Sequence, residues 1–272
     1  MRKILYLWHI FVKVFMFFLF GFGSLILIFL IFPVIRVFTW DKLKFKRKGR
    51  KVMCFTQKIF VAIGTALGGF RLQVENRKVF KDLSSMIIVA NHPSLLDVVM
   101  LLSLIPNADC IIKSSLGKKN ILRGIVNALY IPNSLDFDQL VQACTKSLGE
   151  GNCLIIFPEG TRTKADGRIN LKKGAARIAL ASGCQILPVY IGGTDKAGLR
   201  KHDPLLSYNR YNRYVYTVKT LPAVDPAAYK NQFAPVAARN MTAVIQRMLE
   251  CEYADDAIRI REKESILFDK GK

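Results

Sequence analysis

The chain has 272 residues, 51% of them hydrophobic and 22% charged, which is enough to bury a full core and excludes an intrinsically disordered protein. Its formal net charge of +21 indicates an anionic partner, such as lipid head groups, nucleic acid or an acidic protein. The six cysteines form no Cys-x-x-Cys pair and have no histidines near them. We therefore expect reduced core thiols, with no metal site and no disulfide framework.

The first element is an apolar segment, residues 14–35, which contains 22 positions without a charge. As a helix it would measure about 33 Å, which matches the hydrocarbon core of a bilayer. A cleaved signal peptide is the competing interpretation, but the segment is too long and no small-x-small cleavage site follows it. We expect this segment to insert into a membrane.

A basic stretch follows, with eight cations and a single acid, Asp41. Cations beside a membrane helix bind anionic lipid and place the next domain on the cytosolic side, which in a bacterium is the inner face of the cell inner membrane. Nucleic acid is disfavoured because lipid is the nearer anion. The eight residues are Arg36, Lys42, Lys44, Lys46, Arg47, Lys48, Arg50 and Lys51.

A second apolar segment, residues 54–70, is interrupted by Gln57 and Lys58. It is suited to a re-entrant hairpin with the first segment or to the membrane interface. A single spanning helix and a two-helix monotopic anchor therefore both remain open. In either case we expect residues 1–70 to form a membrane anchor and residues 71–272 to form a cytosol-facing domain.

From residue 71 the pattern alternates between strand and helix. Strands are predicted at 86–90, 110–113, 129–132, 153–157, 186–191 and 214–220, and helices at 95–104, 117–128, 137–148, 171–182 and 234–250. Such alternation predicts an α/β domain with a largely parallel central sheet and flanking helices. Chemistry in such sheets collects at the carboxyl ends of the strands.

The motif Asn-His-Pro-Ser-Leu-Leu-Asp, residues 91–97, follows one of these predicted strands. Pro93 suits the first turn of a helix, and Asn91 is a candidate helix cap. Asp97 lies about one turn into that helix, within reach of the imidazole of His92. A histidine oriented by a carboxylate can take a proton from a hydroxyl near neutral pH. The alternative is a histidine that only caps a helix.

A second motif, Pro-Glu-Gly-Thr-Arg-Thr at residues 158–163, follows the predicted strand 153–157. Gly160 permits close backbone approach, and Arg162 offers a planar fork of donors, so the motif suits an anion or a polar head group. The alternative is a solvated turn with a surface ion pair.

Together the Asn-His-x-x-x-x-Asp pattern and Phe-Pro-Glu-Gly-Thr-Arg closely resemble the glycerolipid acyltransferase family, and the lysophosphatidate acyltransferase group in particular. The resemblance extends from about residue 70 to 195. It includes Lys-Lys-Gly-Ala at residues 172–175 and Leu-Pro-Val at residues 187–189.

The resemblance implies transfer of a fatty acyl group from acyl-CoA or acyl carrier protein to the free hydroxyl of a membrane lysolipid. It implies no permanently bound cofactor and no metal. His92 would be the general base and Asp97 would orient it. The acceptor head group would be bound by Glu159, Gly160, Thr161 and Arg162, with Lys172 and Lys173 as further cations. The competing class is a non-catalytic basic protein that binds the membrane surface.

One position departs from the family pattern. The family's second block commonly ends in Asp-Arg, whereas residues 132–133 here are Pro-Asn. The missing cation leaves two acceptors open. Either Arg162, Lys113, Lys172 or Lys173 replaces it and 1-acyl-glycerol-3-phosphate remains the acceptor, or the acceptor is a lipid or specialised acyl conjugate without a phosphate.

Asn133→Arg separates these two acceptors. If other cations already hold the phosphate, kcat/KM for 1-acyl-glycerol-3-phosphate should change less than about threefold, because the added guanidinium has no free task. If the natural acceptor lacks a phosphate, the wild type should use this lysolipid poorly and the variant should improve on it. Efficient wild-type turnover of 1-acyl-glycerol-3-phosphate would contradict the phosphate-free acceptor.

Overall fold

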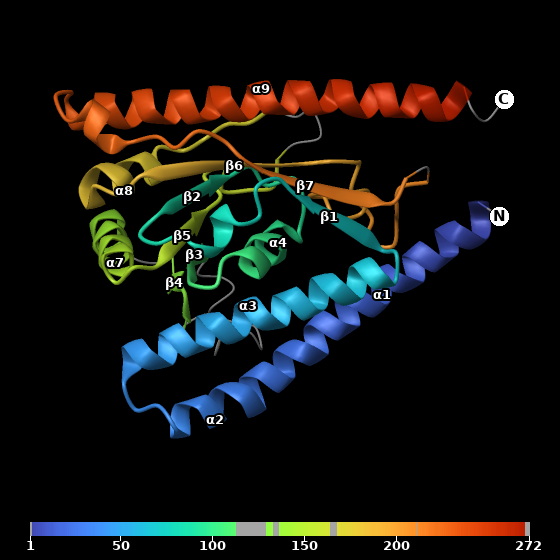
Figure 1. The fold of residues 1–272 in the computed structure, drawn as a ribbon, viewed down its shortest axis with the longest axis horizontal. Coiled ribbons are helices and arrows are strands. Elements are labelled where there is room, and N and C mark those ends of the chain that lie inside the picture. The colour runs from blue at the N-terminus through green and yellow to red at the C-terminus, as the bar shows by residue number, and fades with distance from the viewer. Residues whose placement is uncertain (1, 113–128, 133–135, 164–167, 211, 270–272) are drawn as a thin grey trace.

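The computed structural model describes residues 2–112, 129–132, 136–163, 168–210 and 212–269. Its centre is a seven-stranded sheet in the order β1-β7-β6-β2-β5-β3-β4 (Figure 1). The strands are β1 (Phe70–Val74), β2 (Ile87–Ala90), β3 (Ala108–Ile112), β4 (Ile131–Pro132), β5 (Cys153–Ile156), β6 (Ile186–Gly192) and β7 (Tyr214–Thr220).

The sheet is largely parallel, as predicted. Strands β6, β2, β5, β3 and β4 run in one direction, while β7 is antiparallel to β6 and carries β1 parallel to itself at the edge. Every residue of β2, β5 and β6 is buried, because helices cover both faces of the sheet. The carboxyl ends of β2 and β5 therefore lie next to each other, with Val89 paired to Ile156.

Two layers of helices cover the sheet. One layer contains α7 (Phe137–Gly149), α8 (Gly174–Ser182) and α9 (Ala234–Asp269). The opposite layer contains α4 (Asp97–Leu104) and, beyond it, the N-terminal helices. Each layer closes its own apolar core against the sheet, one around Met100 and Leu101 and the other around Met241 and Leu249. Short 3-10 turns occur at Val79–Lys81 and Pro226–Tyr229.

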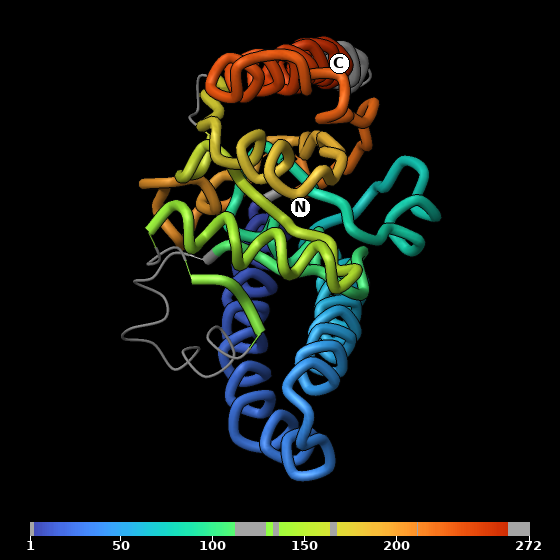
Figure 2. Tube along the Cα trace, turned by 90° about the vertical axis from the view of Figure 1, so that its left-hand side faces the viewer, coloured from blue at the N-terminus to red at the C-terminus, as the bar shows by residue number. Residues whose placement is uncertain are grey.

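The N-terminal part is a helical hairpin. Helix α1 (Arg2–Ile26) continues through a π-helical turn (Leu27–Ile31) into α2 (Phe32–Val37), and α3 (Lys42–Ala66) returns alongside. Figure 2 shows the hairpin and α9 on opposite sides of the sheet. Lys3–Val37 has a mean hydropathy of 2.8 and is long and apolar enough to cross a membrane. The two helices lie side by side, and Lys3–Val37 is the one candidate span among the described residues, so a single spanning helix and a two-helix monotopic anchor both stay predictions.

The hairpin has one apolar face packed against the domain and another apolar face that is exposed. Val12, Met16 and Phe32 are buried in the same core as α4, whereas Phe18 and Phe29 are more than half exposed. The exposed face is an apolar surface suited to lipid. The buried face makes the hairpin part of the wall of the domain.

Several predicted elements change in extent. The predicted strand 129–132 shortens to β4, the helix predicted at 234–250 extends to Asp269, and β1 was not predicted. The helix predicted at 117–128 lies outside the described residues, as does Lys113. Of the cysteines expected in the core, Cys184 is half-buried and Cys251 is exposed; the four buried ones are Cys54, Cys110, Cys144 and Cys153.

The expectation that Arg50 binds lipid head groups is wrong. Arg50 is only 4% exposed, and its Nη2 lies 2.7 Å from Oδ2 of Asp109 on β3. Ser147 of α7 donates a second hydrogen bond to the same carboxylate oxygen at 2.7 Å. Burial raises the pKa of Asp109, while the neighbouring guanidinium opposes that rise. The pair therefore joins the hairpin to the sheet, and Arg50 is not exposed to lipid head groups.

Asp109→Ala should lower the free energy of unfolding by about 3–5 kcal/mol, because it leaves the Arg50 charge buried without a partner. The measurement is denaturant unfolding of the full chain in detergent. The double variant Arg50→Met with Asp109→Leu should recover much of the loss, since no charge is then buried. Asp41→Ala, at an exposed helix cap, should cost only about 1 kcal/mol. Equal stability of Asp109→Ala and wild type would contradict this account.

Candidate active site

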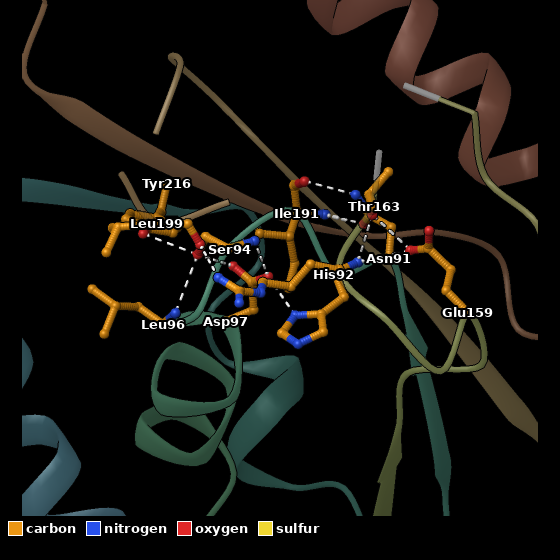
Figure 3. A network of polar contacts seen from close by, with 11 residues as sticks. Asn91, His92, Ser94, Leu96, Asp97, Glu159, Thr163, Ile191, Leu199 and Tyr216 are labelled. Atoms are coloured by element: carbon orange, nitrogen blue, oxygen red, sulfur yellow. Dashed lines mark hydrogen bonds and ion pairs between the residues drawn. The ribbon is translucent and has the colours of Figure 1, made fainter. Parts of the chain in front are cut away.

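The turn between β2 and α4 holds a histidine against a buried carboxylate (Figure 3). Nδ1 of His92 lies 2.8 Å from Oδ2 of Asp97, the first residue of α4. Asp97 is completely buried, whereas the His92 side chain is 19% exposed. The contact fixes the ring with Nδ1 toward the carboxylate, so that Nε2 is left for another partner.

Ser94 completes the surroundings of the carboxylate. Its backbone N–H donates to Oδ2 of Asp97 at 2.7 Å, and its hydroxyl donates to Oδ1 at 2.6 Å. The Ser94 Oγ in turn lies 3.0 Å from Oη of Tyr216 on β7. Burial raises the pKa of Tyr216 well above its usual range, so this phenol stays protonated. Each oxygen of Asp97 is thus satisfied, as a buried carboxylate requires.

The predicted helix start and cap are wrong. The helix begins at Asp97 and not at Leu95, and Pro93 precedes it. The Asn91 amide caps no helix; it donates to the carbonyl of Ile191 at 2.9 Å and accepts from the Ile191 N–H at 2.7 Å. Asn91 thereby ties the end of β2 to β6, in a pairing that local sequence patterns do not contain.

The second motif is bonded to the backbone of the histidine. The His92 N–H lies 3.0 Å from both Oε1 of Glu159 and Oγ1 of Thr163. Thr163 donates its hydroxyl to Glu159 at 2.6 Å and its N–H to the His92 carbonyl at 2.7 Å. Burial raises the pKa of Glu159, and these hydrogen bonds oppose the rise. Glu159 and Thr163 therefore join the turns after β2 and β5.

The remaining predicted site residues lie around this junction. Arg162 is half-buried, and its Nη1 donates to the Leu199 carbonyl at 2.8 Å. Gly160 has φ +69°, and a Cβ there would lie 2.9 Å from Nζ of Lys172, so the ammonium covers this glycine. Thr161 and Lys173 are exposed neighbours of these residues in the chain. The structure thus brings Gly160 and Lys172 into contact.

Two residues close to the pair were missed by the sequence analysis. The ring of Phe157 lies 4.4 Å from that of His92, centroid to centroid. Lys196 is buried, lies 4.8 Å from the Tyr216 ring centroid and donates to the carbonyls of Gly192 and Thr194. Burial lowers the pKa of Lys196 to about 8. Phe157 could have been found from its place before the second motif, but no sequence pattern marks Lys196.

Apolar cavities begin at the turn that carries His92. One of about 240 Å³ and one of about 390 Å³ lie between the hairpin and the domain, and both are lined by Phe20, Phe60, Leu95 and Val99. Leu95 follows His92 by three positions. A third cavity of about 340 Å³, at the ends of β2 and β6, is lined by Thr163, Lys196 and residues of α9. Among the described residues, no group of three or more His, Cys, Asp or Glu could hold a metal ion.

Comparison with known proteins defines the class of this domain. Residues 71–192 match the protein-family model described as Acyltransferase. The match covers both motifs and the sheet from β1 to β6. The resemblance predicted from the two motifs is thereby confirmed over residues 71–192.

The curated relatives narrow the likeness. The chain is 34% identical over 117 residues to the chloroplastic 1-acyl-sn-glycerol-3-phosphate acyltransferase LPAT1 of Arabidopsis thaliana, a match that covers 40% of this chain and 32% of that protein. It is 33% identical over 98 residues to the 1-acyl-sn-glycerol-3-phosphate acyltransferase of Salmonella typhimurium, covering 36% and 37% of the two chains. The alignment thus spans about a third of the length of these relatives.

A solved structure shares the whole fold. The crystal structure of the 1-acyl-sn-glycerophosphate acyltransferase PlsC from Thermotoga maritima matches with a TM-score of 0.63 and 23% identity. The match covers 92% of this chain and 98% of that one, so the common fold includes more than the motif region.

Thr163→Val tests the junction between the two motifs. The substitution keeps the shape of the side chain but removes a hydroxyl that serves Glu159 and the His92 N–H, so the free energy of unfolding should fall by about 1–3 kcal/mol. Thr161→Val, at an exposed position two residues away, is the matched control and should change it by less than about 0.5 kcal/mol. Equal stability of the two variants would contradict the junction.

Proposed function

We propose that the chain is a membrane-bound O-acyltransferase that moves a fatty acyl group from a thioester to the free hydroxyl of a lysophospholipid. The donor is acyl-CoA or the acyl thioester of acyl carrier protein. The acceptor is 1-acyl-glycerol-3-phosphate, and the product is phosphatidate. The single observation that carries this proposal is the 2.8 Å contact between His92 and the buried Asp97, beside apolar cavities. The names of the curated relatives support the acceptor.

His92 is the general base of this reaction. Asp97 accepts the Nδ1–H, so Nε2 carries the lone pair that receives the proton of the acceptor hydroxyl. As that proton arrives, the imidazolium forms next to a carboxylate that is already desolvated and fixed by Ser94. The attraction between the two charges stabilises the transition state without any reorganisation of water.

The chemical step balances without any further reactant. The acceptor oxygen bonds to the thioester carbonyl carbon while its proton passes to Nε2 of His92. The tetrahedral intermediate then expels the thiolate as the carbon–sulfur bond breaks. The proton on His92 passes to that sulfur and gives the free thiol, so the base is restored.

The two apolar cavities receive acyl chains. Burial of each methylene contributes about 0.8 kcal/mol, so a chain laid past Leu95 and Val99 is held while its thioester stays at His92. This places the fatty acid between the hairpin and α4. The exposed face of the hairpin then contacts lipid, and the domain lies on the cytosolic side of the membrane.

Gly160, Arg162 and Lys172 hold the acceptor head group. The Lys172 ammonium lies over Gly160, and Arg162, two residues further along the same turn, has donors beyond the one that bonds to Leu199. The family resemblance assigns Glu159 and Thr161 to the same head-group site. Glu159 contributes by accepting hydrogen bonds from the His92 N–H and the Thr163 hydroxyl, which fix the loop. The exposed Lys173 extends the basic surface. Asn133 lies outside the described residues, so the phosphate-free acceptor stays a second candidate on the sequence departure alone.

His92→Ala should lower acyl transfer at least about a hundredfold, which is the lower end of the usual contribution of a general base. The assay is transfer from a labelled acyl thioester to a panel of lysolipids by the purified full chain. Asp97→Asn should also lower kcat, because it removes the negative charge beside the imidazolium. His202→Ala, an exposed histidine in a loop, is the matched control. Comparable turnover by folded His92→Ala and wild type would remove His92 from the mechanism.

A further inference from the structure

The cavity between the hairpin and α4 has a mixed lining. Most of its wall is apolar, but four polar side chains also face it: Ser24, Thr56, Gln57 and Tyr130. The first two are satisfied within their own helices, since Ser24 donates to the Phe20 carbonyl at 2.7 Å and Thr56 to the Met53 carbonyl at 3.0 Å. Neither hydroxyl therefore needs a hydrogen bond from a molecule in the cavity.

Gln57 and Tyr130 are different. They are 6% and 7% exposed, and the Gln57 Oε1 and the Tyr130 Oη have no hydrogen-bond partner in the part of the chain that the structure describes. A buried polar atom without a partner costs about 1–3 kcal/mol. Both atoms belong to side chains that line a cavity of about 390 Å³, which has room for a ligand group.

A plain hydrocarbon chain does not meet this requirement. Packed against Leu19, Ile63 and Leu102, it would exclude water from Gln57 and Tyr130 and offer neither a donor nor an acceptor. The Gln57 Oε1 accepts hydrogen bonds, and the phenol donates one. Burial raises the pKa of Tyr130 well above its usual range, so the phenol keeps its proton. A hydroxyl group complements both atoms, because it donates and accepts.

We infer that this cavity selects an acyl chain that carries an oxygen substituent, a hydroxyl above all, which pairs with Gln57, Tyr130 or both. The inference rests on the proposed acyl transfer and deepens it by naming the class of acyl chain. The path from the thioester runs past Leu95 and Val99, which line both apolar cavities, to Gln57 on α3. Specificity would thus arise from Gln57 of the hairpin and Tyr130 beside β4, and not from the motifs around His92.

The test compares acyl-CoA thioesters of one chain length. One is unsubstituted, and each of the others carries a single hydroxyl at a different carbon, up to the terminal one. With the full chain in mixed micelles and a fixed lysolipid, kcat/KM for the best hydroxylated chain should exceed that for the plain chain about tenfold or more. A site built to bond a polar group discriminates strongly against analogues that lack it. Equal kcat/KM for the plain chain and every hydroxylated chain would overturn the inference.

Two variants assign that preference to residues. Gln57→Leu and Tyr130→Phe remove the unpaired polar atoms while nearly conserving volume, so each should move the ratio of kcat/KM toward one. Thr65→Val, at an exposed position of α3 outside the cavity lining, is the matched control and should keep the wild-type ratio. Retention of the full preference in both Gln57→Leu and Tyr130→Phe would also overturn the inference.

Calorimetric titration with the corresponding free fatty acids separates this inference from the proposed function. Tighter binding of a hydroxylated acid, lost in Tyr130→Phe, without transfer from any thioester would support the cavity and contradict the acyltransferase. Transfer of plain and hydroxylated chains alike, with equal binding of the acids, would leave the acyltransferase and reject the selective cavity.

Discussion

The burial of the Asp97 carboxylate is the constraint on which the site depends. A charge removed from water is tolerated only if its oxygens are satisfied, and here the turn between β2 and α4 supplies two donors from Ser94 and one from His92. The turn must therefore adopt one conformation. Tyr216, on a strand far away in the chain, closes the network behind Ser94. The orientation of the imidazole is thus a consequence of charge burial.

Two other parts of the structure, the second motif and the hairpin, lie on either side of this turn. On one side, Glu159 and Thr163 bond to the His92 backbone and hold the second motif, which follows β5, against the turn after the neighbouring parallel strand β2. On the other side, the hairpin packs against α4 and leaves apolar space that begins at Leu95. The Arg50–Asp109 ion pair joins that hairpin to the sheet. The hairpin and the domain therefore form the walls of these cavities together.

Local patterns predicted much of this. The apolar run of β2 and the spacing of His92 and Asp97 are contained in a few consecutive residues, so the sheet and the central pair followed from the sequence. The alternation of Phe70, Leu72 and Val74 also marks β1 as an edge strand, but the preceding apolar segment obscured it. The features that the sequence did not predict depend on contacts between residues far apart in the chain. The pairing of Asn91 with β6, the ion pair of Arg50 and the burial of Lys196 join residues that no short window contains together.

The most direct test of the account is the tautomer of the His92 ring. The chain has three histidines, so nitrogen-15 NMR of histidine-labelled protein, assigned with His92→Gln, resolves the ring of interest. Because Asp97 accepts from Nδ1, the neutral ring should carry its proton on Nδ1 and leave Nε2 bare, and Asp97→Asn should disturb this state. A neutral wild-type ring protonated on Nε2 would contradict the account, since Nε2 would then lack the lone pair that the proposed mechanism requires.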